Sequence, residues 1–274
     1  MRYGIEVVTL GACAAPRSVV ALAQAAEAAG WDGLFVWDHL GFVWGAPSAD
    51  PWVTLAAAAQ ATRRLRRGTA VTPLPRRRPQ VLASTVATLD LLSGGRVIFG
   101  AGLGGVPREF TAFGESADAR QRAQRLDEGL ELLERLWAGQ QVTHHGRHYL
   151  VEGVRLAPLP VQRPRIPVWI GGGSRPALRR AARWDGWVTG GVDEQGRLTT
   201  TPEQIASQVG YIRQHRAASA AFDVALTGCS DPGDAALADA FGDAGVTWWL
   251  ESLHGVRGSV EQLRARVEAG PPKG

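Results

Sequence analysis

Several features that mark specialised protein classes are scarce or missing in this chain. It has two cysteines, Cys13 and Cys229, which lie far apart and fit no metal-ligand spacing. Two isolated cysteines predict a reducing compartment rather than a disulfide framework. No run of eighteen apolar residues occurs, so no membrane span is expected. Glu6 interrupts the first apolar run, which is too short for a signal peptide, and the sequence therefore predicts a cytoplasmic protein.

Lysine is also nearly absent, because Lys273 is the only lysine among 30 basic residues. The formal net charge is only +4, and no basic run is interleaved with aromatic residues, so nucleic acid is not an expected partner. Arginine is suited to bidentate binding of carboxylate or phosphate, but its abundance also reflects nucleotide composition. A small-molecule substrate remains the expected partner.

Eight short apolar runs are spread along the chain. They are continuous rather than alternating, which indicates strands buried on both faces and hence a parallel sheet. The runs begin at Tyr3, Gly33, Arg67, Arg96, Ile166, Gly186, Phe222 and Val246.

Helical patterns fill the segments between these runs. Leu126, Leu130, Leu133 and Trp137 form an apolar stripe on the longest of them. N-cap signals precede three later helices, in "TPEQ" at 201, "DPGD" at 231 and "SVEQ" at 259.

Eight strand–helix units of this size predict a (β/α)8 TIM barrel. One unit is longer, and its segment around Gly146 and Gly153 predicts a hairpin inserted before strand five. No linker rich in Gly or Ser occurs, so residues 1–274 are expected to form a single domain.

The active site of such a barrel lies at the C-terminal ends of its strands. Strand two ends in Asp38 and His39, with Trp44 close behind, and Glu109 follows strand four. An imidazole titrates near neutrality, so His39 is a candidate for proton transfer, with Glu109 sharing the role. The alternatives are a core histidine with a satisfied ring and a solvated acid at the start of a helix.

Glycine-rich loops follow two of the strands. In "GGGSRP", Gly172, Gly173 and Ser174 are candidates for binding a phosphate, over which Arg175 would close; the alternative is a tight turn with a plain N-cap. "GAGLGG" formally matches a dinucleotide pattern, but alone that signal is weak. We expect Gly102 and Gly104 to keep this loop small, so that a flat ring can lie over it.

Three histidines gather in the predicted hairpin, at 144, 145 and 148. A metal site is conceivable there, but a solvated hairpin face is the better interpretation. The first strand, "IEVVT", lacks the H-x-H pair typical of metallohydrolase barrels, so no metal is expected.

Longer segments resemble one family. "AEAAGWDGLFVWDHL", "GTAVTPLPRRRPQVLASTVATLDLLSGGRVIFGAGLGG", "REFTAFGE" and "VQRPRIPVWIGGGS" are similar to segments of the luciferase-like flavin-dependent oxidoreductases, as are "AARWDGWV" and "AGVTWWLES". The similarity extends from about residue 3 to residue 270. The resemblance implies the coenzyme F420 or FMN and an enzyme that is a reductase, dehydrogenase or monooxygenase.

The same resemblance assigns roles to residues. His39 and Trp44 match the histidine and tryptophan beside the ring in F420-dependent sugar-phosphate dehydrogenases, and Glu109 matches their second active-site acid. Gly172, Gly173 and Ser174 match the loop that holds the coenzyme phosphate. It also implies a non-proline cis peptide within residues 70–72, forming a bulge that backs the ring and bringing Val71 and Thr72 into the site. Those dehydrogenases carry a glutamate at the end of strand one, which "VVTLGA" lacks, and this argues against a sugar phosphate.

F420 is the favoured coenzyme, because its phosphate and acidic tail suit Arg76, Arg77, Arg78 or Arg108, and because the arginine- and alanine-rich composition is typical of actinomycete-like bacteria, which make F420. The predicted activity is hydride transfer between F420 and a small organic substrate. The alternatives are an FMN-dependent monooxygenase and, from another class, a non-catalytic flavin-binding protein. Family members are often dimers, so a homodimer is possible.

Overall fold

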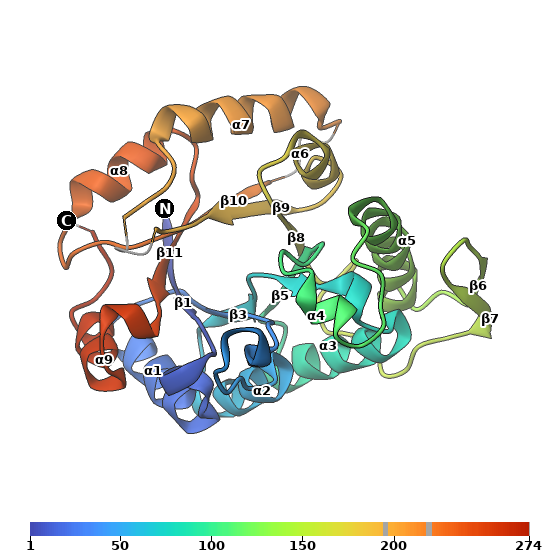
Figure 1. Ribbon diagram of the computed structural model, residues 1–274, viewed down its shortest axis with the longest axis horizontal. Helices are drawn as coiled ribbons and strands as arrows, with labels where there is room; N and C mark the ends of the chain where they lie inside the picture. The colour runs from blue at the N-terminus through green and yellow to red at the C-terminus, as the bar shows by residue number, and fades with distance from the viewer. Residues whose placement is uncertain (194–196, 218–220, 274) are drawn as a thin grey trace.

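A computed structural model describes residues 1–193, 197–217 and 221–273. Its main sheet is parallel and closes on itself through pairing of β3 with β5, which makes the chain a closed (β/α)8 barrel, as predicted. Figure 1 shows the strands at the centre with the helices around the outside. The strands of this sheet are β1 (Arg2–Val7), β2 (Gly33–Val36), β3 (Arg66–Thr69), β4 (Thr72–Pro73), β5 (Val97–Gly102), β8 (Val168–Gly171), β9 (Gly186–Gly190), β10 (Asp223–Gly228) and β11 (Trp248–Leu253).

The predicted third strand is divided into β3 and β4. The peptide bond between Ala70 and Val71 is cis, so the non-proline cis peptide implied by the family resemblance is confirmed. Thr72 resumes the strand and pairs with Ala101 of β5. The interruption places Val71 at the C-terminal end of the barrel, where the cavity described below opens.

The helices of the described residues lie outside the strands, as their apolar stripes predict. They are α1 (Pro16–Ala28), α2 (Pro51–Ala61), α3 (Pro79–Ser93), α4 (Arg108–Thr111), α5 (Ala119–Trp137), α6 (Arg175–Ala181), α7 (Pro202–His215), α8 (Ala235–Asp243) and α9 (Val260–Glu268). Short 3-10 turns η1 (Gly11–Ala14), η2 (Gly41–Trp44), η3 (Leu74–Arg76) and η4 (Gly255–Arg257) occupy loops. No helix in the described part of the chain is long and apolar enough to cross a membrane.

Two of the three predicted N-caps are confirmed. Thr201 begins α7 and Ser259 begins α9, each in a capping box with a glutamine three residues later. The prediction of a helix capped at the start of "DPGD" was wrong, because α8 begins three residues later with Asp234 as its cap. The Pro-Gly pair forms a turn instead, with Gly233 at φ +76°, and Asp234 supplies the oxygen that accepts from the N–H of Leu237.

The predicted insertion is an antiparallel hairpin of β6 (Val142–His145) and β7 (Leu150–Val154), which projects beyond α5 in Figure 1. Glu128 of α5 fastens it by accepting hydrogen bonds from the backbone N–H groups of His148 and Tyr149 and lying 3.0 Å from the Nε2 of His144. Assignment of residues 1–274 to one domain stays a prediction.

Aromatic rings fill the barrel towards the N-terminal ends of its strands. Phe35 stacks on Trp169 with centroids 5.1 Å apart, and Trp248 meets both edge-on. Ile98, Val188, Ala225 and Leu250 pack against these rings. The N-terminal end of the barrel is therefore a packed core, and in the described part of the barrel the space for a ligand lies towards the C-terminal ends of the strands.

Candidate active site

A cavity of about 480 Å³ opens at the C-terminal ends of the barrel strands. That volume lies within the usual range for small-molecule sites. It is lined by Glu6, Trp37, Asp38, His39, Ala70, Val71, Pro73, Gly102, Leu103, Gly104, Gly105, Gly171, Gly172, Gly173, Ser174, Ala177, Val188, Thr189, Gly190, Gly191 and Thr227. Most of this wall is apolar side chain or glycine backbone, which suits a flat, largely apolar ring.

His39 is held by a buried carboxylate. Its Nδ1 lies 3.0 Å from the Oε1 of Glu109, which is fully buried and also accepts from the N–H of Leu40 at 2.5 Å. Trp37 and Trp44 flank the imidazole, with ring centroids 5.1 and 5.3 Å away. Because Nδ1 is engaged, Nε2 is the nitrogen left to meet a ligand.

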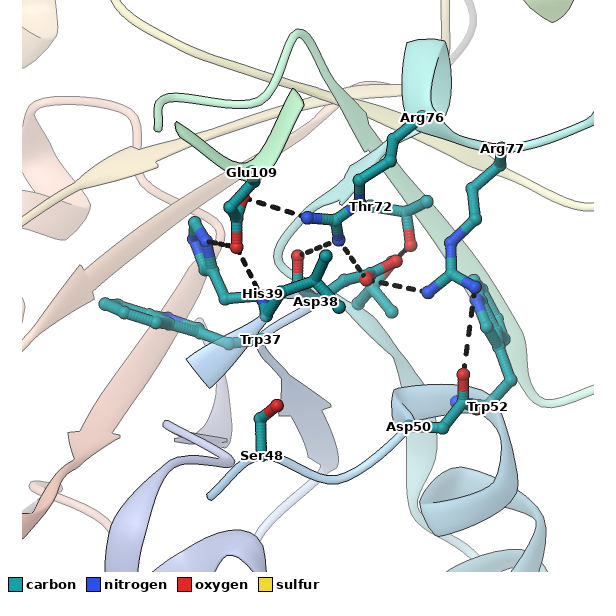
Figure 2. A network of polar contacts seen from close by, with 12 residues as sticks. Trp37, Asp38, His39, Ser48, Asp50, Trp52, Thr72, Arg76, Arg77 and Glu109 are labelled. Atoms are coloured by element: carbon teal, nitrogen blue, oxygen red, sulfur yellow. Dashed lines mark hydrogen bonds and ion pairs between the residues drawn. The ribbon is translucent and has the colours of Figure 1, made fainter. Parts of the chain in front are cut away.

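An ion-pair network fixes this arrangement, as Figure 2 shows. The guanidinium of Arg76 lies 2.7 Å from Asp38 and 2.9 Å from Glu109, and Arg77 lies 2.7 Å from the same Asp38 oxygen. The side chains of Arg76, Asp38 and Glu109 are each less than a tenth exposed. Glu109 thus positions the ring of His39, and Arg76 and Asp38 fix Glu109 within a buried network.

Val71 forms one wall of the cavity, and glycines make room for it. A Cβ added to Gly102 would lie 2.5 Å from the Cγ2 of Val71, and one added to Gly171 would lie 3.0 Å from Cγ1. A Cβ at Gly104 would meet the ring of Phe110 at 2.9 Å. The glycines of "GAGLGG" therefore leave room for the side chains of Val71 and Phe110, in addition to lining the cavity.

Gly102→Ala is expected to weaken binding of a ligand in the cavity about tenfold and to lower the free energy of unfolding by about 1–3 kcal/mol, because the new methyl group displaces Val71. Gly105→Ala is the matched control, since nothing lies within 4 Å of its added Cβ. Fluorescence titration and denaturant unfolding measure the two effects. Equal affinity in both variants would show that the position of Val71 does not matter to the ligand.

The loop after β8 offers exposed backbone at the mouth. Gly172, Gly173 and Ser174 line the cavity, and Gly172 has φ +108°, a conformation that favours glycine. The Oγ of Ser174 accepts from the N–H of Ala177, so Ser174 is the N-cap of α6. Their proposed role in holding a phosphate stays a prediction.

The predicted site residues are not all in the cavity wall. Eight line it: Asp38, His39, Val71, Gly102, Gly104, Gly172, Gly173 and Ser174. The other four do not: Trp44, Thr72, Glu109 and Arg175.

Each of these four has another place in the structure. Glu109 acts on the site through His39. Trp44 stands beside the imidazole with 48% of its surface exposed, and Thr72 turns inward to donate to the hydroxyl of Thr69. Arg175 lies over the ring of Tyr211, 5.3 Å from its centroid, rather than over the loop.

Glu6 is a cavity residue that the sequence interpretation missed. It projects from β1 into the cavity and is 3% exposed. Burial raises the pKa of its carboxyl to about 7, and the hydrogen bond from Thr227 only partly offsets that effect. An acid inside the otherwise apolar run "YGIEVVT" was the available signal.

The arginines expected to bind an acidic tail are largely committed elsewhere. Arg76 and Arg77 pair with Asp38, and Arg108 lies over Phe42. Arg78 is exposed and lines a separate groove of about 660 Å³ beside the hairpin, together with Arg125. That groove is larger than the cavity but contains neither His39 nor Glu6, so it is not the candidate active site.

No group of histidine, cysteine, aspartate and glutamate side chains within the described ranges is arranged to hold a metal ion. The hairpin histidines pair with carboxylates instead, His144 with Glu128 and His145 with Glu152. Cys13 and Cys229 are free thiols.

A parallel barrel with a histidine–carboxylate pair and glycine loops at its C-terminal mouth defines a small-molecule enzyme of the TIM-barrel class. The family model described as luciferase-like monooxygenase matches residues 4–269. The chain belongs to this family, and it is an oxidoreductase.

Two curated relatives and one solved structure are similar to the chain. The F420-dependent glucose-6-phosphate dehydrogenase of Microbacterium testaceum is 36% identical over 181 residues, covering 64% of this chain and 52% of that protein. The F420-dependent hydroxymycolic acid dehydrogenase of Mycobacterium tuberculosis is 30% identical over 226 residues, covering 75% of this chain and 62% of that protein. The chain thus spans about half to three fifths of their lengths.

The solved structure is an F420-dependent secondary alcohol dehydrogenase in complex with an F420–acetone adduct. It superposes with a TM-score of 0.79 at 19% identity and covers 98% of both chains. At that identity the likeness concerns the fold.

Proposed function

We propose that the protein transfers a hydride between coenzyme F420 and a small organic substrate. The observation that carries this proposal is the cavity beside His39. The chain belongs to the luciferase-like family, and two of its relatives are named as F420-dependent dehydrogenases. When bound, F420 supplies or accepts the hydride. The protein then has to bind the coenzyme and the substrate, orient them, and transfer the accompanying proton.

The residues of the cavity fit such a coenzyme. A planar ring needs a wall without bulky projections, and Val71 with its neighbouring glycines would supply one. The exposed loop of Gly172, Gly173 and Ser174 would hold the coenzyme phosphate. The buried, unpartnered Oε2 of Glu6 is a polar atom within the cavity wall that a polar ring edge would satisfy.

His39 is placed to move the proton that accompanies hydride transfer. Nε2 would exchange it with a substrate hydroxyl or carbonyl, while Glu109 fixes the ring through Nδ1. Arg76 in turn holds Glu109 and Asp38 in place. Trp37 and Trp44 flank the imidazole and limit access of water.

A second candidate is an FMN-dependent monooxygenase, because the matching family model is described as luciferase-like monooxygenase. FMN has a similar tricyclic ring and a phosphate, so the same cavity residues would bind it. The two candidates therefore differ in coenzyme rather than in site.

Titration of the apo-protein with F420 and with FMN, followed by fluorescence, tests the proposal. We expect F420 to bind the tighter of the two and its visible absorbance to bleach when a panel of secondary alcohols is added. Tight binding of FMN with no measurable affinity for F420 would refute it, and oxygen consumption with reduced FMN would then support the monooxygenase. Binding of either coenzyme without turnover of any panel member would favour a non-catalytic flavin-binding protein.

A further inference from the structure

The carboxyl of Glu6 is a buried polar group to which the proposed reaction gives no chemical role. It lies in the cavity wall next to Trp37 and Thr227. Its Oε1 accepts a hydrogen bond from the Oγ1 of Thr227 at 3.2 Å. Its Oε2 is buried and has no hydrogen-bond partner within the described part of the chain. A buried oxygen without a partner costs stability, and its position in a ligand cavity points to the ligand as the missing partner.

The charged and titratable groups near Glu6 come from three neighbouring elements. Asp38 and His39 follow β2 and line the same cavity, Cys229 follows β10, and Glu251 lies on β11. Asp38 and Glu251 are paired with arginines, and His39 is paired with a carboxylate. None of these groups is a cause of the raised pKa of Glu6, which comes from burial. Burial is therefore the main cause of the raised pKa of Glu6.

We propose that Glu6 is a coenzyme-binding residue, whose protonated carboxyl donates a hydrogen bond from Oε2 to a carbonyl oxygen on the edge of the bound ring. This inference rests on the proposed function, because it requires the ring to occupy the cavity. Oε1 is already engaged as an acceptor, so Oε2 is the oxygen available to the ligand, and in the neutral acid it supplies a donor. The ring systems of F420 and FMN both carry carbonyl oxygens, which an ionised Glu6 would repel.

This role makes coenzyme affinity dependent on pH. With a pKa of about 7, Glu6 is roughly half protonated at neutral pH in the free protein. Binding selects the protonated form, so at neutral pH it takes up about half a proton. The dissociation constant is lowest below pH 7, rises as pH passes through that value, and levels off on the order of tenfold higher, where the hydrogen bond is lost.

The test compares wild type with Glu6→Gln and Thr227→Val in titrations with F420, and separately with FMN, from about pH 5 to about pH 9. Titration of the coenzyme itself affects all three proteins alike, so the differences between their profiles report on Glu6. Glu6→Gln keeps a neutral donor at every pH and should lack the tenfold rise. Thr227→Val removes a hydrogen bond that lowers the pKa of Glu6, so its midpoint should shift to higher pH. Calorimetry in buffers of different ionisation enthalpy measures the proton uptake directly.

Denaturant unfolding of each variant shows whether a change in affinity comes from a change in stability. The ionised form of Glu6 is the one that burial disfavours, so Glu6→Gln should be at least as stable as wild type at alkaline pH. Identical pH profiles for wild type and Glu6→Gln would overturn the inference while leaving F420 binding, and hence the proposed function, intact. A Glu6-dependent profile with FMN, with no F420 binding, would overturn the proposed function and keep the inference. Failure of both coenzymes to bind would overturn both.

Discussion

Replacing His39 with alanine is expected to slow substrate-dependent bleaching of F420 by about 10²–10⁴-fold, because a positioned general acid–base group contributes that much. The dissociation constant for the coenzyme should change only severalfold, since the imidazole is one residue of a wall made mostly of glycine and apolar groups. Stopped-flow absorbance measures the rate, and fluorescence titration measures the affinity.

His148→Ala is the matched control for this prediction. His148 lies in the inserted hairpin, outside the cavity, and its ring contacts Gln124. Its removal should leave the rate unchanged. Unaltered turnover in His39→Ala would remove His39 from the mechanism, even if the coenzyme binds as proposed.

Arg76→Met is expected to lower the free energy of unfolding by about 3–5 kcal/mol, because buried Glu109 loses its guanidinium partner and buried Asp38 keeps only Arg77. Asp38 and Glu109 are 2% and 0% exposed in their side chains, so water cannot replace the guanidinium without opening the site. Chemical denaturation, monitored by tryptophan fluorescence, measures the change.

Two further variants separate charge from packing in this prediction. Arg78→Met removes a neighbouring exposed arginine and should change the stability by no more than about 0.5 kcal/mol. Adding Glu109→Gln to Arg76→Met should recover part of the loss, because it removes the buried charge that has lost its guanidinium partner. If Arg76→Met were as stable as Arg78→Met, the buried network would not be what holds His39.

The barrel could be predicted from the sequence because its strands are buried on both faces. A run such as "VTWWLES" has no polar alternation, and eight runs of this kind separated by helical patterns are typical of a (β/α)8 barrel. The division of the third strand at Ala70–Val71 was different, because it came from the family resemblance and not from residue patterns. The start of α8 was misplaced because both aspartates of "DPGD" are acceptable caps, and tertiary packing decides between them.

The sequence predicted where the site lies, but it did not predict which side chains of the site contact one another. Topology alone places Asp38 and His39 at the catalytic end of the barrel. Sequence patterns do not show that Arg76 turns inward between two carboxylates, because that depends on the conformation of the loop after the interrupted strand. Glu6 was visible as an acid in the first apolar run, but its place in the cavity was not predicted, because the run does not show which side chains point into the barrel.

The most direct test of this account is a crystal structure of the protein with F420 bound. We predict that the ring lies in the cavity between Val71 and the His39 segment, with the coenzyme phosphate at Gly172, Gly173 and Ser174 and a ring carbonyl oxygen within hydrogen-bond distance of the Oε2 of Glu6. A coenzyme bound instead in the groove lined by Arg78 and the hairpin, with the barrel mouth left to solvent, would contradict it.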